Sequence, residues 1–401
     1  MLDAYIYDGL RSPIGRHAGT LAPLRPDDMA AQILRALMAR SAFKPELVED
    51  VILGCTNQGG EDSRNVARFV GLLSGLPVES AGQTVNRLCA SGLAAVADAA
   101  RLVTCGEGEL FVAGGVESMS RAPFVLAKAE SAYSRDGRMV DSTIGTRFPN
   151  PKVTAEFGNH SNAETADNVA VDLQLTREAS DAFALASQSK YAAAKADGFF
   201  EGEIHPVEVP TGNRKAPVVV IAEDEHPRPD TDAAALARLR PLHGGGVVTA
   251  GNASGINDGA AALLIGSRAV GEKAGVQPLA RILGTAVAGV PPRVMGLGPV
   301  PAITKVLQRT GLSLKDLDLI EINEAFATQV LGCLKQLGLS ADDSRLNPNG
   351  GAIALGHPLG CTGARLALTA VRQLHRTGGR YAVVSLCIGV GQGIATVIER
   401  V

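Results

Sequence analysis

A diverged internal repeat is the feature that most constrains how this chain can fold. Residues 92–105 and 363–376 are both rich in alanine with apolar residues at helical spacing, and each precedes a glycine-containing break and a short apolar run. A second pair, residues 50–55 and 318–323, aligns at nearly the same offset, 268 positions against 271. Segments of α/β proteins resemble one another in general, but two blocks in the same order at nearly one offset favour duplication. The repeat predicts two similar α/β halves, each with a central sheet and covering helices.

The two halves do not fill the chain. Proline and charged residues become more frequent between about residues 121 and 248, and a helix is predicted inside this stretch at 176–197. Long connections in compact proteins are usually functional. We therefore expect a first half at 1–120 with 249–270, an inserted loop or lid domain at 121–248, and a second half at 271–401.

Composition excludes several classes of protein. Hydrophobic residues make up 46% and charged residues 20% of the 401 residues, and the net charge is −3, which excludes a disordered chain and a polybasic nucleic-acid binder. Aromatic residues are only 4% and Trp is absent, so the core must be built from small aliphatic side chains. No run approaches the roughly 20 apolar residues of a membrane span, and the first residues lack the pattern of a secretory leader. We expect a cytoplasmic protein that binds neither nucleic acid nor membrane.

The six cysteines are widely spaced and include no Cys-x-x-Cys pair, so neither a disulfide framework nor a metal site is expected. Cys89 directly precedes the first alanine-rich helix. The N–H groups at a helix N-terminus stabilise a thiolate, which would lower the pKa of Cys89 and favour a nucleophile. The alternative is a small buried apolar residue, the ordinary environment of a free cysteine.

Two further candidates lie in glycine-rich loops. His357 stands in the loop 347–363 ahead of the second alanine-rich helix, and a histidine in a rigid loop suits a general base, although a lone histidine is more often structural. Cys361 follows, but no further ligands accompany the pair, so metal binding is not expected. Cys387 ends an apolar strand, where sites of α/β proteins usually form. The Gly-x-Gly-x-Gly string after it lacks the spacing of a dinucleotide loop.

Asn323 and Glu324 follow the predicted strand 319–322. Side chains at a strand end can hold water or an oxyanion, and Asn323 could equally cap the next helix with Glu324 in its first turn. The small-residue stretch 248–262 either cradles a ligand or forms a tight turn into a packed strand.

Taken together, these segments resemble the thiolase family over the full length of the chain. The matching segments, in family order, are 86–92, 114–120, 250–259, 323–327, 347–358 and 387–393. The resemblance implies a thiolase-like fold: two duplicated βαβαβαββ halves in a five-layered αβαβα arrangement, with a loop domain inserted in the first. It also implies a homotetramer or a dimer, and no permanently bound cofactor or metal.

The resemblance assigns a role to each catalytic candidate. Cys89 corresponds to the acylated nucleophile, and His357 to the base that activates it and polarises the substrate. Cys387 corresponds to the acid and base that exchanges a proton with the α-carbon. Asn323 corresponds to the residue that holds a water beside His357, and the N–H groups of Cys89 and Gly389 to an oxyanion hole.

Coenzyme A as a substrate would lie between the loop domain and the core. Ala250 and Ser254 correspond to residues that contact the pantetheine, Arg228 to one at the nucleotide end, and Met295 and Phe326 to the pocket wall. The sequence departs from the family at His160–Asn162, since many thiolases carry a methionine over the reactive end of the substrate at Asn162.

Within the family, residues 8–16, 54–68 and 141–148 resemble those of thiolases that cleave 3-oxoadipyl-CoA in bacterial aromatic catabolism. That acyl group ends in a carboxylate, which needs a cation or hydrogen-bond donors at the pocket end. Arg147 is the candidate cation, and a structural salt bridge is the alternative for it. The competing functions are an acetyl-CoA acetyltransferase acting on acetoacetyl-CoA, a ketoacyl synthase, and a non-catalytic acyl-CoA binder.

Overall fold

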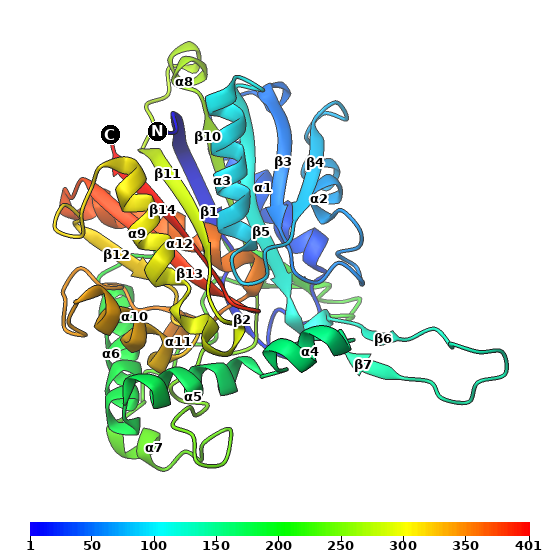
Figure 1. Cartoon of the computed structure of the whole chain (residues 1–401). Coiled ribbons are helices and arrows are strands. Elements are labelled where there is room, and N and C mark those ends of the chain that lie inside the picture. The colour runs from blue at the N-terminus through cyan, green and yellow to red at the C-terminus, as the bar shows by residue number, and fades with distance from the viewer.

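The computed structural model describes residues 1–401 and contains one large mixed sheet (Figure 1). Its strand order is β12-β13-β14-β11-β1-β10-β5-β3-β4. The strands of the first half are β1 (Ala4–Arg11), β3 (Val48–Gly54), β4 (Ala81–Val85), β5 (Leu110–Ser118) and β10 (Asn257–Gly266), with the short β2 (Gly15–Arg16) beside β10. Those of the second half are β11 (Ala280–Gly289), β12 (Leu319–Ile322), β13 (Tyr381–Ile388) and β14 (Gln392–Arg400).

The two halves repeat one topology, as the sequence repeat predicts. The series β1-β10-β5-β3 and β11-β14-β13-β12 each contain two antiparallel pairs followed by one parallel pair. The halves join where β1 pairs antiparallel with β11. The second half departs from the predicted βαβαβαββ pattern at one place, because the counterpart of β4 is reduced to a single parallel bridge between Ile320 and Leu346.

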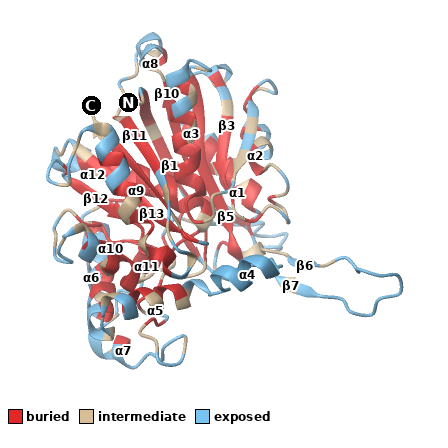
Figure 2. Cartoon of the chain, in the orientation of Figure 1, coloured by how far each residue is buried: buried red, intermediate tan, exposed pale blue.

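Five layers follow from which residues share each hydrophobic core. The central helices α3 (Ser91–Cys105) and α12 (Leu359–Thr377) lie between the inner faces of the two halves of the sheet. Helices α1 (Pro26–Arg40) and α2 (Val66–Ser74) cover the outer face of the first half, and α9 (Pro299–Thr310) and α10 (Ala327–Leu337) that of the second. Burial is continuous through these layers (Figure 2).

Strand β10 shows how the sequence produces the layers. Its residues Ala261, Leu263 and Ile265 face the central helices, whereas the intervening residues face the outer ones. Side chains alternate along a strand, so a strand that is covered on both faces needs an unbroken apolar run. All ten residues of β10 are buried, which accounts for the low charge of this segment.

The central helices cross at glycines. A Cβ added at Gly92 of α3 would lie 2.5 Å from Gly360 O and 2.9 Å from Ala364 N, and one added at Gly363 of α12 would collide with the backbone of Leu93. Gly92 and Gly363 are equivalent in the repeat. Because neither residue has a side chain, the two helices meet at backbone contact near their N-termini.

The segment between β5 and β10 contains the inserted elements. A long hairpin, β6 (Phe124–Leu126) with β7 (Met139–Asp141), projects from the body (Figure 1). The other elements are α4 (Pro151–Phe157), α5 (Asn162–Leu173), α6 (Arg177–Ala196), β8 (Val207–Pro210), β9 (Val218–Ile221) and α7 (Ala233–Ala237). Helix α6 matches the predicted helix at 176–197. The domain boundaries stay a prediction.

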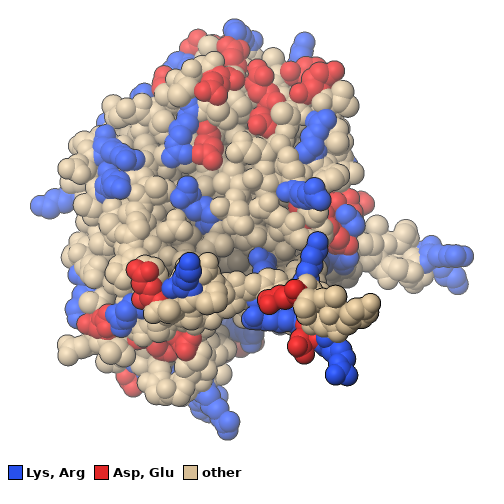
Figure 3. Space-filling view, turned by 45° about the vertical axis from the view of Figure 1, so that its right-hand side comes forward, with Lys and Arg blue, Asp and Glu red and all other residues tan.

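Two short helices, α8 (Arg268–Ala274) and α11 (Ala352–Leu355), complete the chain. The stretch Leu88–Cys105 is long and apolar enough to cross a membrane by length and composition, but it contains the central helix α3, and 67% of it is buried inside the protein. On the face shown in Figure 3, basic and acidic side chains are interspersed.

We expect Gly92→Ala to lower the free energy of unfolding by about 1–3 kcal/mol, because overpacking forces the central helices apart. Gly71→Ala in α2 is the matched control, since a Cβ there would lie at ordinary van der Waals distance, 3.5 Å from Val51 Cγ2. That change should raise stability by about 0.5–1 kcal/mol, the usual gain of Ala over Gly in a helix. Urea denaturation compares the two variants, and equal stability of Gly92→Ala and the unchanged protein would contradict the helix-crossing argument.

Candidate active site

The catalytic candidates lie where the central helices begin and where two strands end. Cys89 stands two residues before α3, and His357 stands two residues before α12. Asn323 directly follows β12, and Cys387 is the penultimate residue of the neighbouring parallel strand β13. The carboxyl ends of parallel strands lie at the same edge of a sheet. The fold therefore brings these residues from both halves of the chain to one place.

Cys89 is buried and is a neutral thiol at rest. It is 6% exposed, and burial raises the pKa of its thiol to about 11. The N–H of Gly389 donates to the sulfur and opposes this effect without overcoming it. The expectation of a lowered pKa is therefore wrong. The reason is geometric, because the N-cap of α3 is Ala90, so Cys89 lies before the first turn and inside the protein.

His357 is also neutral, and its hydrogen bonds define which nitrogen carries the proton. Nδ1 lies 2.7 Å from Thr362 Oγ1, whose hydroxyl donates to Pro358 O at 2.9 Å. The threonine oxygen therefore accepts from Nδ1–H, which leaves Nε2 unprotonated, with its lone pair toward Asn323 Nδ2 at 3.4 Å. Burial lowers the pKa of His357 to about 3, and the positive charge of Arg365 acts in the same direction. His357 is thus poised to accept a proton at Nε2.

Asn323 lies beside that nitrogen. Its Nδ2 is 3.4 Å from His357 Nε2, and its Oδ1 is buried without a protein hydrogen-bond partner. The helix-cap alternative for Asn323 is wrong, because the N-cap of α10 is Phe326. Glu324 is not a first-turn residue either, since α10 begins at Ala327. Its buried carboxylate accepts from Ser187 Oγ at 2.6 Å and from Asn347 Nδ2 at 3.0 Å.

Cys387 is fully buried next to the nucleophile candidate. Its thiol has a pKa raised well above the usual value by burial, and the neighbouring thiols of Cys89 and Cys333 add to the effect. A thiol that is held away from water can donate its proton to a bound group and, as the thiolate, take a proton back without first exchanging it with solvent.

The predicted ligand-binding residues fall into two groups. Met295 and Phe326 pack with Cys387 and Ala325, and the N–H of Ser254 donates to Ala325 O at 2.9 Å, which attaches Ser254 to this cluster. Ala250 and Arg228 are exposed, and Arg228 is attached through its N–H to Gln188 Oε1 at 3.0 Å. Ala250 and Arg228 lie on segments around the site rather than against the thiols.

The two specificity candidates differ in position. Asn162, at the start of α5, is exposed, and its Oδ1 lies 3.8 Å from the place of a Cβ at Gly389, so it borders the mouth of the site. Arg147 forms no ion pair. Its Nη2 donates to Ser142 O at 3.1 Å, and its Nε is buried without a partner. The salt-bridge alternative for Arg147 is therefore wrong.

Sequence reasoning missed the residues that support His357. Besides Thr362, Asn257 accepts from the His357 N–H at 2.8 Å and donates to Gly15 O at 2.9 Å, which fixes the loop to the first half. The repeat contained one usable signal, because Thr362 is equivalent to Ser91, whose hydroxyl bonds Leu88 O at 2.6 Å. Both hydroxyls brace the turn that opens a central helix.

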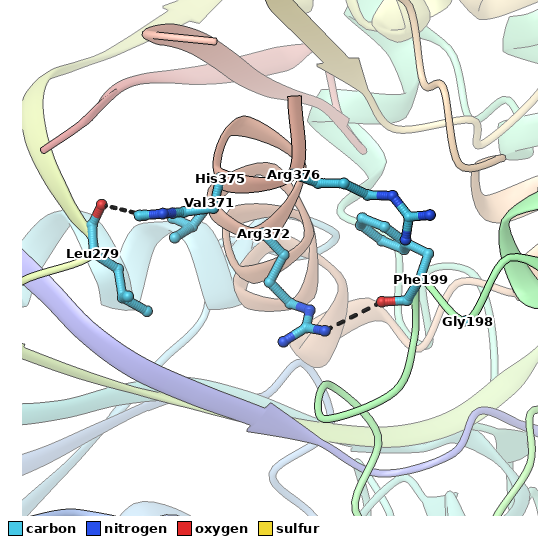
Figure 4. A pocket seen from close by; sticks show the side chains of 7 residues that line it. All are labelled: Gly198, Phe199, Leu279, Val371, Arg372, His375 and Arg376. Atoms are coloured by element: carbon cyan, nitrogen blue, oxygen red, sulfur yellow. Dashed lines mark hydrogen bonds between the residues drawn. The ribbon is translucent and has the colours of Figure 1, made fainter. Parts of the chain in front are cut away.

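A pocket of about 300 Å³ lies away from these residues, near the C-terminal end of α12 (Figure 4). Its polar side chains already bond to the protein: His375 Nε2 donates to Leu279 O at 2.7 Å, and Arg372 Nη2 donates to Phe199 O at 3.2 Å. It shares no residue with the site around Cys89.

Comparisons with known proteins identify the family. Residues 4–269 match the family Thiolase, N-terminal domain, and residues 276–400 match Thiolase, C-terminal domain. The chain belongs to the thiolase family. It is 56% identical to a 3-oxoadipyl-CoA/3-oxo-5,6-dehydrosuberyl-CoA thiolase of Escherichia coli K12 and 54% identical to a β-ketoadipyl-CoA thiolase of Pseudomonas putida, and both alignments cover 100% of each chain.

Solved structures agree with this membership. The fold matches that of the Bacillus anthracis acetyl-CoA acetyltransferase with a TM-score of 0.93 and 40% identity, covering 100% of this chain and 99% of that one. It matches human mitochondrial 3-ketoacyl-CoA thiolase in complex with CoA with a TM-score of 0.91 and 40% identity, covering 100% and 98%.

The site predicts how Cys89 reacts with a small electrophile. Since the pKa of its thiol is about 11, few molecules carry the thiolate at pH 7, and alkylation depends on proton transfer to His357. His357→Gln should lower the rate of Cys89 alkylation by iodoacetamide at pH 7 by about 100-fold, the ordinary contribution of a positioned base. Mass spectrometry follows the modification, and the exposed Cys105 serves as an internal control whose rate should not change. Equal rates for Cys89 in both proteins would contradict the assignment of Nε2 as the proton acceptor.

Proposed function

We propose that this protein is an acyl-CoA C-acyltransferase that cleaves 3-oxoadipyl-CoA with coenzyme A to succinyl-CoA and acetyl-CoA. The observation that carries the proposal is identity of 53–56% over the full chain to β-ketoadipyl-CoA thiolases. The geometry of the site supports it, because two buried thiols, a neutral imidazole and an amide stand together, as breaking a carbon–carbon bond beside a carbonyl requires.

In the first step, the Cys89 sulfur attacks the 3-oxo carbon while its proton passes to His357 Nε2. The neutral states of both groups at rest support this order, since the thiol has a pKa of about 11 and the imidazole has one of about 3. Backbone N–H groups of Cys89 and Gly389 stabilise the oxyanion that forms on the attacked carbon.

In the second step, the bond between C2 and C3 breaks and leaves a succinyl thioester on Cys89. The electron pair forms the enolate of acetyl-CoA, whose oxygen receives hydrogen bonds from the protonated His357 and from a water held by Asn323. Cys387 then protonates C2, which releases acetyl-CoA. Finally, coenzyme A deprotonated by Cys387 attacks the acyl-Cys89 thioester, the Cys89 sulfur leaves and takes back its proton from His357, and succinyl-CoA is released. No metal takes part in any of these steps.

Coenzyme A enters between the loop domain and the core in this proposal. Met295 and Phe326 form the wall next to Cys387, Ser254 and Ala250 contact the pantetheine, and Arg228 lies at the nucleotide end. Support comes from the packing of Met295 and Phe326 with the buried thiol, from the hydrogen bond of Ser254 to Ala325 in the same cluster, and from the exposure of Ala250 and Arg228.

A second candidate function is an acetyl-CoA acetyltransferase acting on acetoacetyl-CoA. Its support is the fold match to an enzyme of that description. The two functions share every catalytic residue and differ only in what the acyl pocket recognises.

We also infer a cytoplasmic homo-oligomer, either a homotetramer or a dimer. Strand β4 ends the sheet with an open edge, and apolar side chains of the adjoining helix are exposed, as are those of the projecting hairpin. Open sheet edges and grouped apolar side chains are sites of chain association. All six cysteines are free, which fits a reducing compartment.

The test of the function is thiolysis by the purified protein. We expect kcat/KM for 3-oxoadipyl-CoA to exceed that for acetoacetyl-CoA by at least about 10-fold, because burying a recognised carboxylate contributes about 1.5–3 kcal/mol. Preference for acetoacetyl-CoA would support the second candidate function instead. A folded protein with no thiolysis of either substrate would refute both.

Arg147 is our candidate for the recognition of the distal carboxylate, since its guanidinium forms no ion pair within the protein. Arg147→Ala should lower kcat/KM for 3-oxoadipyl-CoA by roughly 10- to 100-fold, the effect of losing one charge-assisted hydrogen bond, and leave acetoacetyl-CoA unaffected. Arg138→Ala, which removes another cation of the same region stacked on Phe148, is the matched control. An unchanged kcat/KM for 3-oxoadipyl-CoA in Arg147→Ala would exclude this role.

A further inference from the structure

Glu117, near the end of β5, is a buried carboxylate with no cation beside it. It is 2% exposed and takes part in none of the ion pairs of the protein. A buried charge without a partner is costly unless hydrogen bonds replace its hydration. The groups that donate hydrogen bonds to Glu117 are therefore the groups that its carboxylate holds in place.

Those partners come from both halves of the chain. Glu117 accepts from the N–H groups of Thr56 at 3.0 Å and Asn57 at 3.1 Å, in the loop after β3. It also accepts from the N–H of Gly360 at 2.8 Å, in the first turn of α12, three residues after His357. One side chain therefore clamps a loop of the first half to the turn of the second half that holds the base.

The same loop is attached to the segment of the nucleophile. Asn86, three residues before Cys89, donates from Nδ2 to Thr56 O at 3.2 Å. The turn at Gly360 lies against the strand ends, since a Cβ there would be 2.5 Å from Val116 O and 2.6 Å from Gly54 O. A continuous series of short contacts thus runs from Cys89 through the loop at Thr56 and through Glu117 to the turn of His357.

We propose that Glu117 is a positioning residue that sets the separation of His357 and Cys89 through its two carboxylate oxygens. The proposal rests on the thiolase function. Glu117 touches neither substrate nor reacting atoms, and its effect passes through the backbone at Thr56, Asn57 and Gly360. Its two oxygens serve three donors, which only an ionised carboxylate satisfies without a clash of hydrogens.

The chemistry of the surrounding groups excludes a metal as the reason for the cluster. Cys55, Asp62 and Glu117 have ligand-type atoms within 4.8 Å of one another. However, the Cys55 thiol bonds Asn57 O at 3.0 Å, and both oxygens of Glu117 already accept backbone N–H groups. The atoms of Cys55 and Glu117 that could bind a metal therefore already make hydrogen bonds within the protein.

The charge of Glu117 gives the test a second readout. Its negative charge acts on the Cys89 thiol and contributes to raising the pKa of that thiol. Burial raises the pKa of Glu117 itself to about 7. The other titratable groups around the pair are Cys387 from β13, His357 and Cys361 from the turn and start of α12, and Cys55 and Asp62 from the loop after β3.

Two substitutions separate position from charge. Glu117→Asp keeps the charge and withdraws the oxygens by one methylene, so kcat for thiolysis should fall by about 100-fold, the usual effect of a misplacement near 1 Å, at an unchanged KM. Glu117→Gln should lower kcat and also shift the pH profile of Cys89 alkylation by iodoacetamide to lower pH, because the negative charge is gone. Asp50→Asn is the matched control, since this carboxylate lies at the other end of β3 and touches neither loop, and it should change none of these values.

Wild-type kcat in Glu117→Asp, or an unmoved alkylation profile in Glu117→Gln, would overturn the proposal. A loss of kcat that is accompanied by a large fall in melting temperature would also overturn the proposal, because it would indicate a structural role for Glu117. If Glu117→Gln does not fold, Glu117→Asp decides the question through the split between kcat and KM. If the unchanged protein shows no thiolysis, the proposed function fails, and the alkylation profile still tests the effect of Glu117 on Cys89.

Discussion

The backbone contact between α3 and α12 is the constraint on which the rest of the structure depends. Gly92 and Gly363 are equivalent positions of the repeat, and each packs against the other helix where a side chain would collide. Because the helices meet near their N-termini, the residues just before them arrive in one place, Cys89 from the first half and His357 from the second. The other layers bury the central helices α3 and α12, and the small side chains of these helices make their close approach possible.

Burial, more than the helix dipole, sets the protonation of the site. Cys89 and Cys387 remain thiols and His357 remains an imidazole because charge is expensive where water is excluded. The site therefore holds no ion pair at rest, and charge would develop only as a substrate reacts. In the proposed reaction, hydrogen-bond donors fixed in advance, such as the N–H of Gly389, would meet that charge without rearrangement of solvent.

The sequence was sufficient for the architecture, since the repeat at an offset of 271 corresponds to two halves with one strand order. The candidate residues Cys89, His357, Asn323 and Cys387 were also recognisable, because each stands at the end of a strand or just before a helix. The pKa of Cys89 and the cap at Phe326 were not predictable in this way. Both depend on where a helix begins to within a residue and on how deep that point lies, which are tertiary properties. Glu117 lies in the matching segment 114–120, but its role was not predictable for a related reason, because its partners are backbone N–H groups that no sequence pattern marks.

The repeat also explains why two similar halves form one site. An offset of 271 pairs His357 with Asn86, Gly360 with Cys89, and Cys387 with Val116. At the counterpart of the nucleophile a glycine is required, because any side chain at 360 would collide with Val116 O and Gly54 O. At the counterpart of the base, Asn86 instead bonds Thr56 O and fixes the nucleophile's loop. Each half thus supplies one of the two reactive side chains, Cys89 or His357. The residue at the equivalent position of the other half, Gly360 or Asn86, makes a structural contact instead. A second site related by the repeat is excluded, since its places are filled by the contacts that hold the first one together.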